Sequence, residues 1–279
     1  MNIILLFTYG VSLNDWEDTG ILHRELSYYH YLREKYNINI TFLTFGNTED
    51  EDIEINGVQI IPIYKYFYKT PFKTINYLLS IFIPFMLKNK LPKNNVVVKT
   101  NQLNGSWIAI ILKLILKAEK LIIRTGYNPE IFAKQDEKSY PKILFYKLQN
   151  FISLRLCNYY LLTSVSDKDY LESNFSNKFL DKIRIVPNWL GTREYQPIDD
   201  RKNKNILSVG RLETQKNFEE LIRIFKDTQY TLDIYGEGSL KSELKSLAKE
   251  SNVTVNFYGK LSNKELIEIY EKYKYYVTT

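Results

Sequence analysis

Two cations stand five residues apart in the segment VGRLETQKN, residues 209–217. Gly210 lets the chain turn sharply out of the apolar run before it, so that Arg211 projects from a strand end. Lys216 is expected in the first turn of the helix-period run that follows. Because a helix N-terminus already carries positive partial charge, a cation there favours a shared anion, and a diphosphate fits. Spacing alone leaves two solvated surface cations as the alternative.

Two more glycine-containing loops follow strand-like runs further along the chain. YGEGSLKSEL places Gly236 and Gly238 between a strand and a helix. This is part of the dinucleotide-binding pattern GxGxxG, although a lysine stands in place of the third glycine. FYGKLSNKEL places Lys260 and Leu261 before a capping-box pattern. Three successive strand ends therefore present such loops at one edge of a predicted sheet.

The elements that hold these loops alternate along most of the chain. Seven strand-like runs, NIILLFT, NITFLTF, VQIIPIY, VVVKT, KLIIRT, YYLLTS and KIRIVP, are separated mostly by helix-period segments. After a polar stretch with two prolines, four strand-like and three helix-like segments follow. This alternation predicts an α/β fold of parallel sheets covered on both faces. We expect two Rossmann-like doubly wound domains, 1–190 and 204–279, joined by a linker, 191–203, with a ligand cleft between them.

Three pieces of the second domain carry a family resemblance when they are taken together. Residues 209–217, YGEGSLKSELKSLA and VNFYGKLSNKELIEIYEKYKYYV match in order and spacing. They resemble the retaining glycosyltransferases of family 4 (group 1 glycosyltransferases), which have the GT-B fold. KIRIVPNWLGTREYQP is similar to the interdomain segment of that family, although LGT stands where an apolar-Asp pair is usual. The resemblance covers most of residues 160–279 and is weaker upstream.

This resemblance assigns roles to particular residues. It implies that Arg211 and Lys216 hold the donor diphosphate and stabilise the charge on the leaving nucleotide, with no metal or other cofactor. The donor site would also include a glycine at the first helix of the chain, the glycines of the second domain and the loop that meets the base: Gly20, Gly210, Gly236, Gly238, Lys260 and Leu261. Contacts with the acceptor or donor sugar would come from two strand ends of the first domain: Asn101, Arg124 and Tyr127.

The resemblance also implies a function. We expect transfer of a hexose from a nucleotide diphosphate sugar to a glycan or lipid-linked acceptor in cell-surface polysaccharide synthesis, with retention of configuration. Two alternatives stay open: a nucleotide-sugar epimerase on the same two-domain plan, and a non-catalytic remnant or nucleotide-binding module. The family's E-x7-E acidic segment would follow YKYYVTT, where the chain stops. We therefore expect a truncated copy or a fragment, with an incomplete second domain and poor or absent turnover alone.

Charge is unevenly distributed along the chain. Residues 55–118 contain no Asp or Glu and nine lysines, with aromatic residues among them in IYKYFYKTPFK. Such a segment suits an anionic membrane surface, and a solvated face is the alternative; nucleic acid is not the expected partner. The apolar run at 75–87 contains a proline and is shorter than the ~20 residues that span a bilayer. We expect a cytoplasmic protein, peripheral on the inner membrane face.

The remaining residues that could take part in chemistry are expected to have only structural or solvent-exposed roles. The single cysteine, Cys157, is expected to be a buried structural thiol, and the lack of a second one indicates a reducing compartment. His23 and His30 are expected on a helix surface rather than at a metal. The acidic run at 49–54 is expected to be a solvated loop.

Overall fold

The structure is a computed structural model, and it describes residues 1–175, 177–189 and 202–278. The chain divides into two compact units, Met1–Gly191 and Thr192–Thr279, and each is described by itself. Most of the predicted linker, 191–203, lies outside the described residues, and the first strand of the second unit already begins at Lys202. The cleft expected between the domains stays a prediction.

The first unit is built on a parallel sheet of seven strands in the order β3-β2-β1-β4-β5-β6-β7. All seven strands expected from the sequence are confirmed. The chain runs outward from β1 through β2 to β3, and then returns to β4 on the other side of β1, so a topological switch point lies between β1 and β4. The strands are β1 (Asn2–Leu6), β2 (Asn39–Thr44), β3 (Val58–Pro62), β4 (Val96–Thr100), β5 (Lys120–Thr125), β6 (Tyr159–Leu162) and β7 (Ile183–Ile185).

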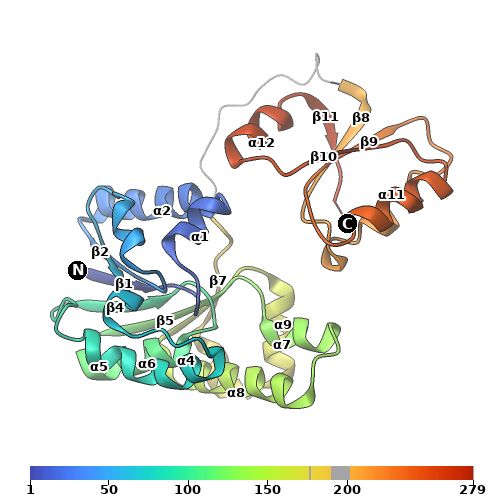
Figure 1. Ribbon diagram of the computed structural model, residues 1–279. Coiled ribbons are helices and arrows are strands. Elements are labelled where there is room, and N and C mark those ends of the chain that lie inside the picture. The colour runs from blue at the N-terminus through green and yellow to red at the C-terminus, as the bar shows by residue number, and fades with distance from the viewer. Residues whose placement is uncertain (176, 190–201, 279) are drawn as a thin grey trace. The chain divides into compact units, whose positions relative to one another are not determined.

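Helices cover both faces of this sheet, with α1 and α2 on one face and α5, α6 and α8 on the other (Figure 1). The apolar run at 75–87 lies in three short helical pieces, α4, η2 and α5, rather than in one helix. Pro84 lies in the first turn of the last piece, because proline is tolerated there and not in a helix interior. The elements are α1 (Leu13–Asp18), α2 (Ile21–Tyr36), η1 (Thr48–Asp52), α3 (Ile63–Tyr66), α4 (Lys73–Leu79), η2 (Ser80–Phe82), α5 (Ile83–Leu87), α6 (Ser106–Leu116), α7 (Pro129–Gln135), α8 (Tyr140–Leu156), α9 (Val165–Asn174) and η3 (Asn177–Lys182).

Helix α2 packs one apolar face into the core of the first unit. Leu22 and Tyr29, seven residues apart on this helix, are both buried in that core. Cys157 is buried too, and desolvation raises the pKa of its thiol to about 11, as befits a structural thiol.

The acidic run at 49–54 differs from its prediction at one residue. Asp50 is fully buried, and its Oδ2 and Oδ1 accept hydrogen bonds from the backbone N–H groups of Leu13 at 3.0 Å and Asn14 at 3.2 Å. These groups begin α1, where the first N–H groups have no partner within the helix. The expectation of a wholly solvated run was therefore wrong, because one carboxylate serves as a remote cap for a helix that the sequence did not reveal.

The second unit contains a parallel sheet of four strands in the order β10-β9-β8-β11. Helices α10 and α11 share one core with the sheet through Leu221, Ile222 and Leu244, and α12 contributes Leu266 and Ile269 to a second core. The elements are β8 (Lys202–Val209), η4 (Thr214–Lys216), α10 (Phe218–Ile224), β9 (Thr231–Tyr235), α11 (Lys241–Glu250), β10 (Val255–Gly259), α12 (Asn263–Tyr270) and β11 (Tyr273–Tyr276). The predicted four strands and three helices are confirmed.

One carboxylate ties this sheet together across its strands. Asp233 of β9 is fully buried and accepts hydrogen bonds from the three other strands of this sheet. The donors are Asn205 Nδ2 at 2.8 Å, Asn256 Nδ2 at 2.7 Å and the Tyr273 hydroxyl at 2.6 Å. Desolvation, with the hydrogen bond to Asp233 second, raises the pKa of Tyr273, so this hydroxyl stays protonated and donates.

Candidate functional site

Arg211 and Lys216 lie on the loop that leaves the carboxyl end of β8, and both side chains are exposed. Arg211 Nη2 donates to Gln215 Oε1 at 3.4 Å. The Cγ and Cδ atoms of Lys216 lie 3.5 Å from the position that a Cβ atom would take on Gly210. The Lys216 side chain thus passes over the turn that Gly210 makes, and one short loop carries both cations at the sheet edge.

The local structure corrects the expected position of Lys216. The residue lies in the 3₁₀ turn η4, and not in the first turn of α10, which begins at Phe218. Asn217 separates the two with a left-handed backbone, φ 44°, that the sequence did not predict. Lys216 therefore does not lie at a helix N-terminus, and the helix dipole gives no support for an anion there. The remaining support for a bound anion is that two cations lie on one loop.

The loops after β8 and β9 are joined by backbone hydrogen bonds. The N–H of Gly210 donates to the Tyr235 carbonyl at 3.1 Å, and the N–H of Leu212 donates to the Glu237 carbonyl at 3.0 Å. The Leu212 carbonyl in turn accepts from the N–H of Leu240 at 3.0 Å. The cation-bearing loop is thereby held against the glycine loop that follows β9.

Gly236 and Gly238 make this approach possible. A Cβ atom on Gly236 would lie 1.8 Å from the Gly210 carbonyl oxygen, and one on Gly238 would lie 2.3 Å from the Leu212 carbonyl oxygen. Backbone atoms cannot yield as a flexible side chain can, so no larger residue fits at either position. Contact between the two loops accounts for these glycines, and their contact with a nucleotide stays a prediction.

An acid lies between the two cations in sequence and cross-links the same loops. The carboxylate of Glu213 accepts from the N–H of Ser239 at 3.0 Å and from its hydroxyl at 2.8 Å. These hydrogen bonds stabilise the charged form and lower the pKa of Glu213. The sequence analysis did not single out Glu213, since only the fold reveals that Ser239, 26 residues away, is its partner.

The third loop, between β10 and α12, completes this edge of the second sheet. Gly259 forms a bridge with Gly236, so the loop is adjacent to the one after β9. Lys260 is exposed, whereas Leu261 packs against the core formed around Leu207. The structure confirms the predicted capping box that begins α12. The three loops thus lie side by side, as the parallel order of their strands predicted, and their contact with a nucleotide base stays a prediction.

In the first unit, the carboxyl ends of β4 and β5 bring two predicted residues together. Arg124 Nη1 donates to both oxygens of Asn101 at 3.4 Å, and Arg124 Nη2 donates to Asn188 Oδ1 at 2.5 Å. Both Asn101 and Arg124 are buried. Tyr127 is half exposed instead, and the edge of its ring packs on Phe132 at a centroid distance of 5.4 Å. Substrate contacts by the three predicted residues stay a prediction.

Gly20 lies where its prediction put it, at the beginning of α2. It is the N-cap residue, its backbone is left-handed with φ 72°, and it supplies no side-chain cap. Glycine suits this position because only it adopts such a conformation without steric cost. A contact of Gly20 with donor phosphates stays a prediction.

A lysine beside Arg124 is buried, and the sequence analysis did not predict this burial. Lys99 of β4 is 7% exposed, and its Nζ donates to the Tyr29 hydroxyl of α2 at 2.8 Å. Desolvation and, second to it, the Arg124 charge lower the pKa of Lys99 to about 7, although the nearby Glu25 carboxylate opposes both effects. Lys99 is one of the nine lysines of residues 55–118, but it lies neither at a membrane-facing surface nor on a solvated face, because β4 is buried on both faces.

The histidines lie on α2, as expected, with His23 exposed and His30 half-buried. Within the described ranges, no three His, Cys, Asp or Glu side chains gather in a way that could hold a metal ion. The expectation that no metal is required stays a prediction, because the reaction itself is untested.

Comparison with solved structures identifies the class of fold. The whole chain aligns with 74% of the lipopolysaccharide outer core galactosyltransferase WaaB in its apo form, with a TM-score of 0.66 and 14% identity. It also aligns over 94% of its length with 70% of Anabaena Alr3699/HepE, in a structure with UDP and glucose, with a TM-score of 0.60 and 12% identity. Two parallel-sheet units with these neighbours define the GT-B type of α/β fold.

Sequence comparison then narrows the class. Residues 193–279 match the family model described as glycosyl transferases group 1. The chain is 25% identical over 198 residues, 68% of its length, to a *Campylobacter jejuni* enzyme, GalNAc-alpha-(1->4)-GalNAc-alpha-(1->3)-diNAcBac-PP-undecaprenol alpha-1,4-N-acetyl-D-galactosaminyltransferase. The match covers 51% of that enzyme, and the chain spans about half the length of the curated relatives it matches. These matches support a group 1 glycosyltransferase.

Proposed function

We propose that this protein transfers a hexose from a nucleotide diphosphate sugar to a glycan or lipid-linked acceptor in cell-surface polysaccharide synthesis. The observation that carries the proposal is the pair of exposed cations, Arg211 and Lys216, on the first of three adjacent loops at the carboxyl edge of the second sheet. This is the edge at which open α/β sheets bind ligands. The segment also lies within the range that matches the group 1 glycosyltransferases.

In this proposal the two cations bind the donor diphosphate. As the bond from the sugar to the diphosphate breaks, negative charge builds on the departing phosphate, and fixed positive groups stabilise it. Two cations of this kind would supply that stabilisation without a metal ion. Backbone hydrogen bonds from Gly210 and Leu212 to Tyr235 and Glu237 hold Arg211 in place before the substrate binds. Transfer with retention of configuration is part of the proposal, by resemblance to family 4.

The acceptor side of the proposal rests on other observations. The name of the Campylobacter relative specifies a lipid-linked acceptor. Residues 55–118 of this chain contain no Asp or Glu. No helix in the described ranges is both long and apolar enough to cross a membrane. We propose that the protein works on the cytoplasmic side of the membrane, where nucleotide sugars are made, and contacts an anionic membrane surface through this segment.

The donor site can be tested by the thermal stability of the protein with nucleotides. We expect one of UDP, GDP or their sugars to raise the unfolding temperature, because a ligand at ~100 times its Kd stabilises by about 2.7 kcal/mol. The variant Arg211→Ala/Lys216→Ala should lose this shift. A matched control, Lys226→Ala/Lys249→Ala, removes two exposed cations from the same unit and should keep it.

The outcomes test where the nucleotide binds. A shift lost only in the Arg211→Ala/Lys216→Ala variant supports a diphosphate at these residues and identifies the base. An equal shift in both double variants would mean that the nucleotide binds elsewhere, and the assignment of Arg211 and Lys216 would fall. No shift with any nucleotide would overturn the donor site in this chain.

A further inference from the structure

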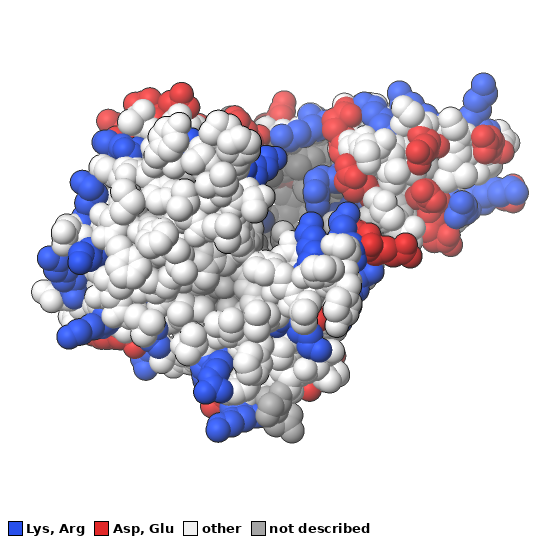
Figure 2. All heavy atoms as spheres, turned by 60° about the horizontal axis from the view of Figure 1, so that its bottom comes forward, with Lys and Arg blue, Asp and Glu red and all other residues white. Residues whose placement is uncertain are grey.

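The first unit exposes an unusually large apolar face. It is formed by α4, η2, α5 and α8, and its members include Leu78, which is 68% exposed, Phe85 and Leu148, both 53% exposed, and Phe82 at 55%. Figure 2 shows this face as a broad expanse without charge, with Lys and Arg side chains along its edges. Soluble proteins rarely expose contiguous apolar patches of this kind unless the patch binds something.

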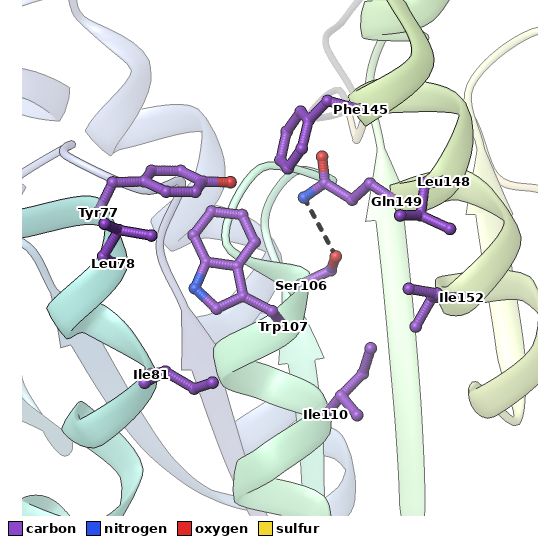
Figure 3. A pocket seen from close by; sticks show the side chains of 10 residues that line it. All are labelled: Tyr77, Leu78, Ile81, Ser106, Trp107, Ile110, Phe145, Leu148, Gln149 and Ile152. Carbon is purple, nitrogen blue, oxygen red and sulfur yellow. Dashed lines mark hydrogen bonds between the residues drawn. The ribbon is translucent and has the colours of Figure 1, made fainter. Parts of the chain in front are cut away.

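A pocket of about 240 Å³ opens on this apolar face, between α4, α6 and α8. Figure 3 shows Tyr77 and Ile81 on one side, Trp107 and Ile110 at the middle, and Leu148 on the opposite side, among the residues that line it. An apolar cavity of about 150 Å³ holds one benzene molecule, so this pocket has room for part of one hydrocarbon chain.

Few polar groups line the pocket, and most of them already have hydrogen-bond partners within the protein. Gln149 is buried, and its Nε2 donates to the Leu103 carbonyl at 2.9 Å and to Ser106 Oγ at 3.3 Å, which ties α8 to α6. Among the described residues, Gln149 Oε1 and the Tyr77 hydroxyl have no hydrogen-bond partner. Two such atoms at one end cannot match the many hydroxyl groups of a sugar or nucleotide. The pocket therefore suits a hydrocarbon chain with at most one polar group.

The charges around the apolar face indicate where that chain comes from. Lys73 lies one turn before Tyr77 on α4, Lys113 lies one turn after Ile110 on α6, and Lys147 lines a second apolar pocket beside Leu148. No ion pair involves any of these three lysines in the part of the chain that the structure describes, and residues 55–118 contain no acid. An apolar face with lysines at its edge is complementary to the surface of an anionic bilayer.

We propose that the apolar face of α4, η2, α5 and α8 docks on an anionic lipid bilayer, and that the pocket takes the hydrocarbon chain of one lipid. This deepens the proposed function, because it names the surface that would meet a lipid-linked acceptor. It also places half of that surface on α8, outside the lysine-rich segment 55–118. A second copy of the chain is the other occupant that an apolar face of this size could have.

Trp107 in the pocket provides a direct probe of the chain. Vesicles of equal parts phosphatidylglycerol and phosphatidylcholine, with bromine on the acyl chains, quench tryptophan that contacts them. We expect quenching in the wild-type protein that is largely absent in Trp107→Phe, whose remaining tryptophans are Trp16 in the core and Trp189 beside α2. Phosphatidylcholine vesicles alone should give much weaker binding.

Variants of exposed residues test the face without disturbing the core. Leu78→Asp/Leu148→Asp should reduce vesicle partitioning at least tenfold, because two exposed leucines lose their burial in lipid. Lys73→Gln/Lys147→Gln should reduce it by about fivefold per lysine on anionic vesicles only. The matched controls, Ile224→Asp and Lys249→Gln, change an exposed apolar residue and an exposed lysine of the second unit and should have no effect.

Each other outcome overturns the proposal. Vesicle binding without quenching of Trp107 would mean adsorption at the headgroups and an empty pocket. No vesicle binding, with a dimer in sedimentation that Leu78→Asp/Leu148→Asp dissociates, would assign the face to a second copy.

Unchanged circular dichroism and unfolding temperature show that the variants fold. The vesicles contain no nucleotide, so failure here leaves the donor site untouched, and failure of the nucleotide test leaves this result standing.

Discussion

At the scale of single residues, Lys99 has the most unusual environment in the first unit. Its ammonium group is buried beside Arg124, with Glu25 as the compensating charge and the Tyr29 hydroxyl as its hydrogen-bond acceptor. The rings of Tyr28 and Tyr29 lie within 5.8 Å and 5.2 Å of Nζ, measured to their centroids. These contacts do not fully replace water, so burial still lowers the pKa of Lys99 to about 7.

This pKa makes stability depend on pH in a defined direction. Between pH 7 and the unfolded value of 10.5, the unfolded chain binds more protons at Lys99 than the folded protein, so stability rises with pH. Below pH 7 the residue is charged in both states and the full cost of burying it is present. We expect the unfolding free energy of the wild type, relative to Lys99→Met, to rise between pH 7 and 9 by at most about 1.4 kcal/mol per pH unit.

Urea unfolding of both proteins at pH 6, 7, 8 and 9 measures this difference, in which groups common to both proteins cancel. Lys93→Met is the matched control, because Lys93 is exposed and its variant should differ from the wild type by the same amount at every pH. If the difference in unfolding free energy between the wild type and Lys99→Met were also independent of pH, a lowered pKa for the buried lysine would be contradicted.

At the scale of elements, the three loops of the second unit depend on close backbone contact. Gly238→Ala would push a methyl group against the Leu212 carbonyl, which lies 2.3 Å from the new Cβ atom. We expect a loss of about 2–4 kcal/mol in the stability of the second unit, together with loss of the nucleotide-induced thermal shift, because Arg211 moves with Leu212. Urea unfolding and the thermal-shift assay measure the two effects.

Gly210→Ala is the control within the same loops. Its Cβ atom would lie 3.4 Å from the Phe218 ring and 3.5 Å from the Lys216 side chain, which are ordinary contacts with atoms that can yield. We expect a stability change within about 1 kcal/mol. If both variants lost stability equally, the close approach at Gly238 would not be the cause of its requirement for glycine.

The sequence predicted these elements better than it predicted their contacts. Alternation of strand-like and helix-like runs was enough for all eleven strands, and parallel order was enough to put three loops on one edge. It could not give the partners of Asp50 or Glu213, since each lies more than 20 residues away and becomes a neighbour only through the fold. The left-handed Asn217 that moved Lys216 out of α10 is likewise a local choice among several that the residue types allow.

At the scale of the whole molecule, the two units have separate cores. The core residues of the first unit all lie between positions 3 and 183, and those of the second between positions 207 and 273. A change that removes a central contact in one core should therefore act on that unit alone. Asp233 offers the sharpest case, because three strands of the second sheet donate to its carboxylate.

Asp233→Ala would remove the acceptor of the buried Tyr273 hydroxyl and of the half-buried side-chain amides of Asn205 and Asn256. Each unpaired group costs about 1–3 kcal/mol, so we expect the second unit to lose about 3 kcal/mol or more. In hydrogen exchange measured by mass spectrometry, peptides from β8 to β11 should lose protection while those from β1 to β7 keep it. Glu250→Ala removes an exposed acid from α11 and should change neither set. Loss of protection in both sheets of Asp233→Ala would show that the units unfold as one cooperative body, and separate cores would then be no guide to separate stability.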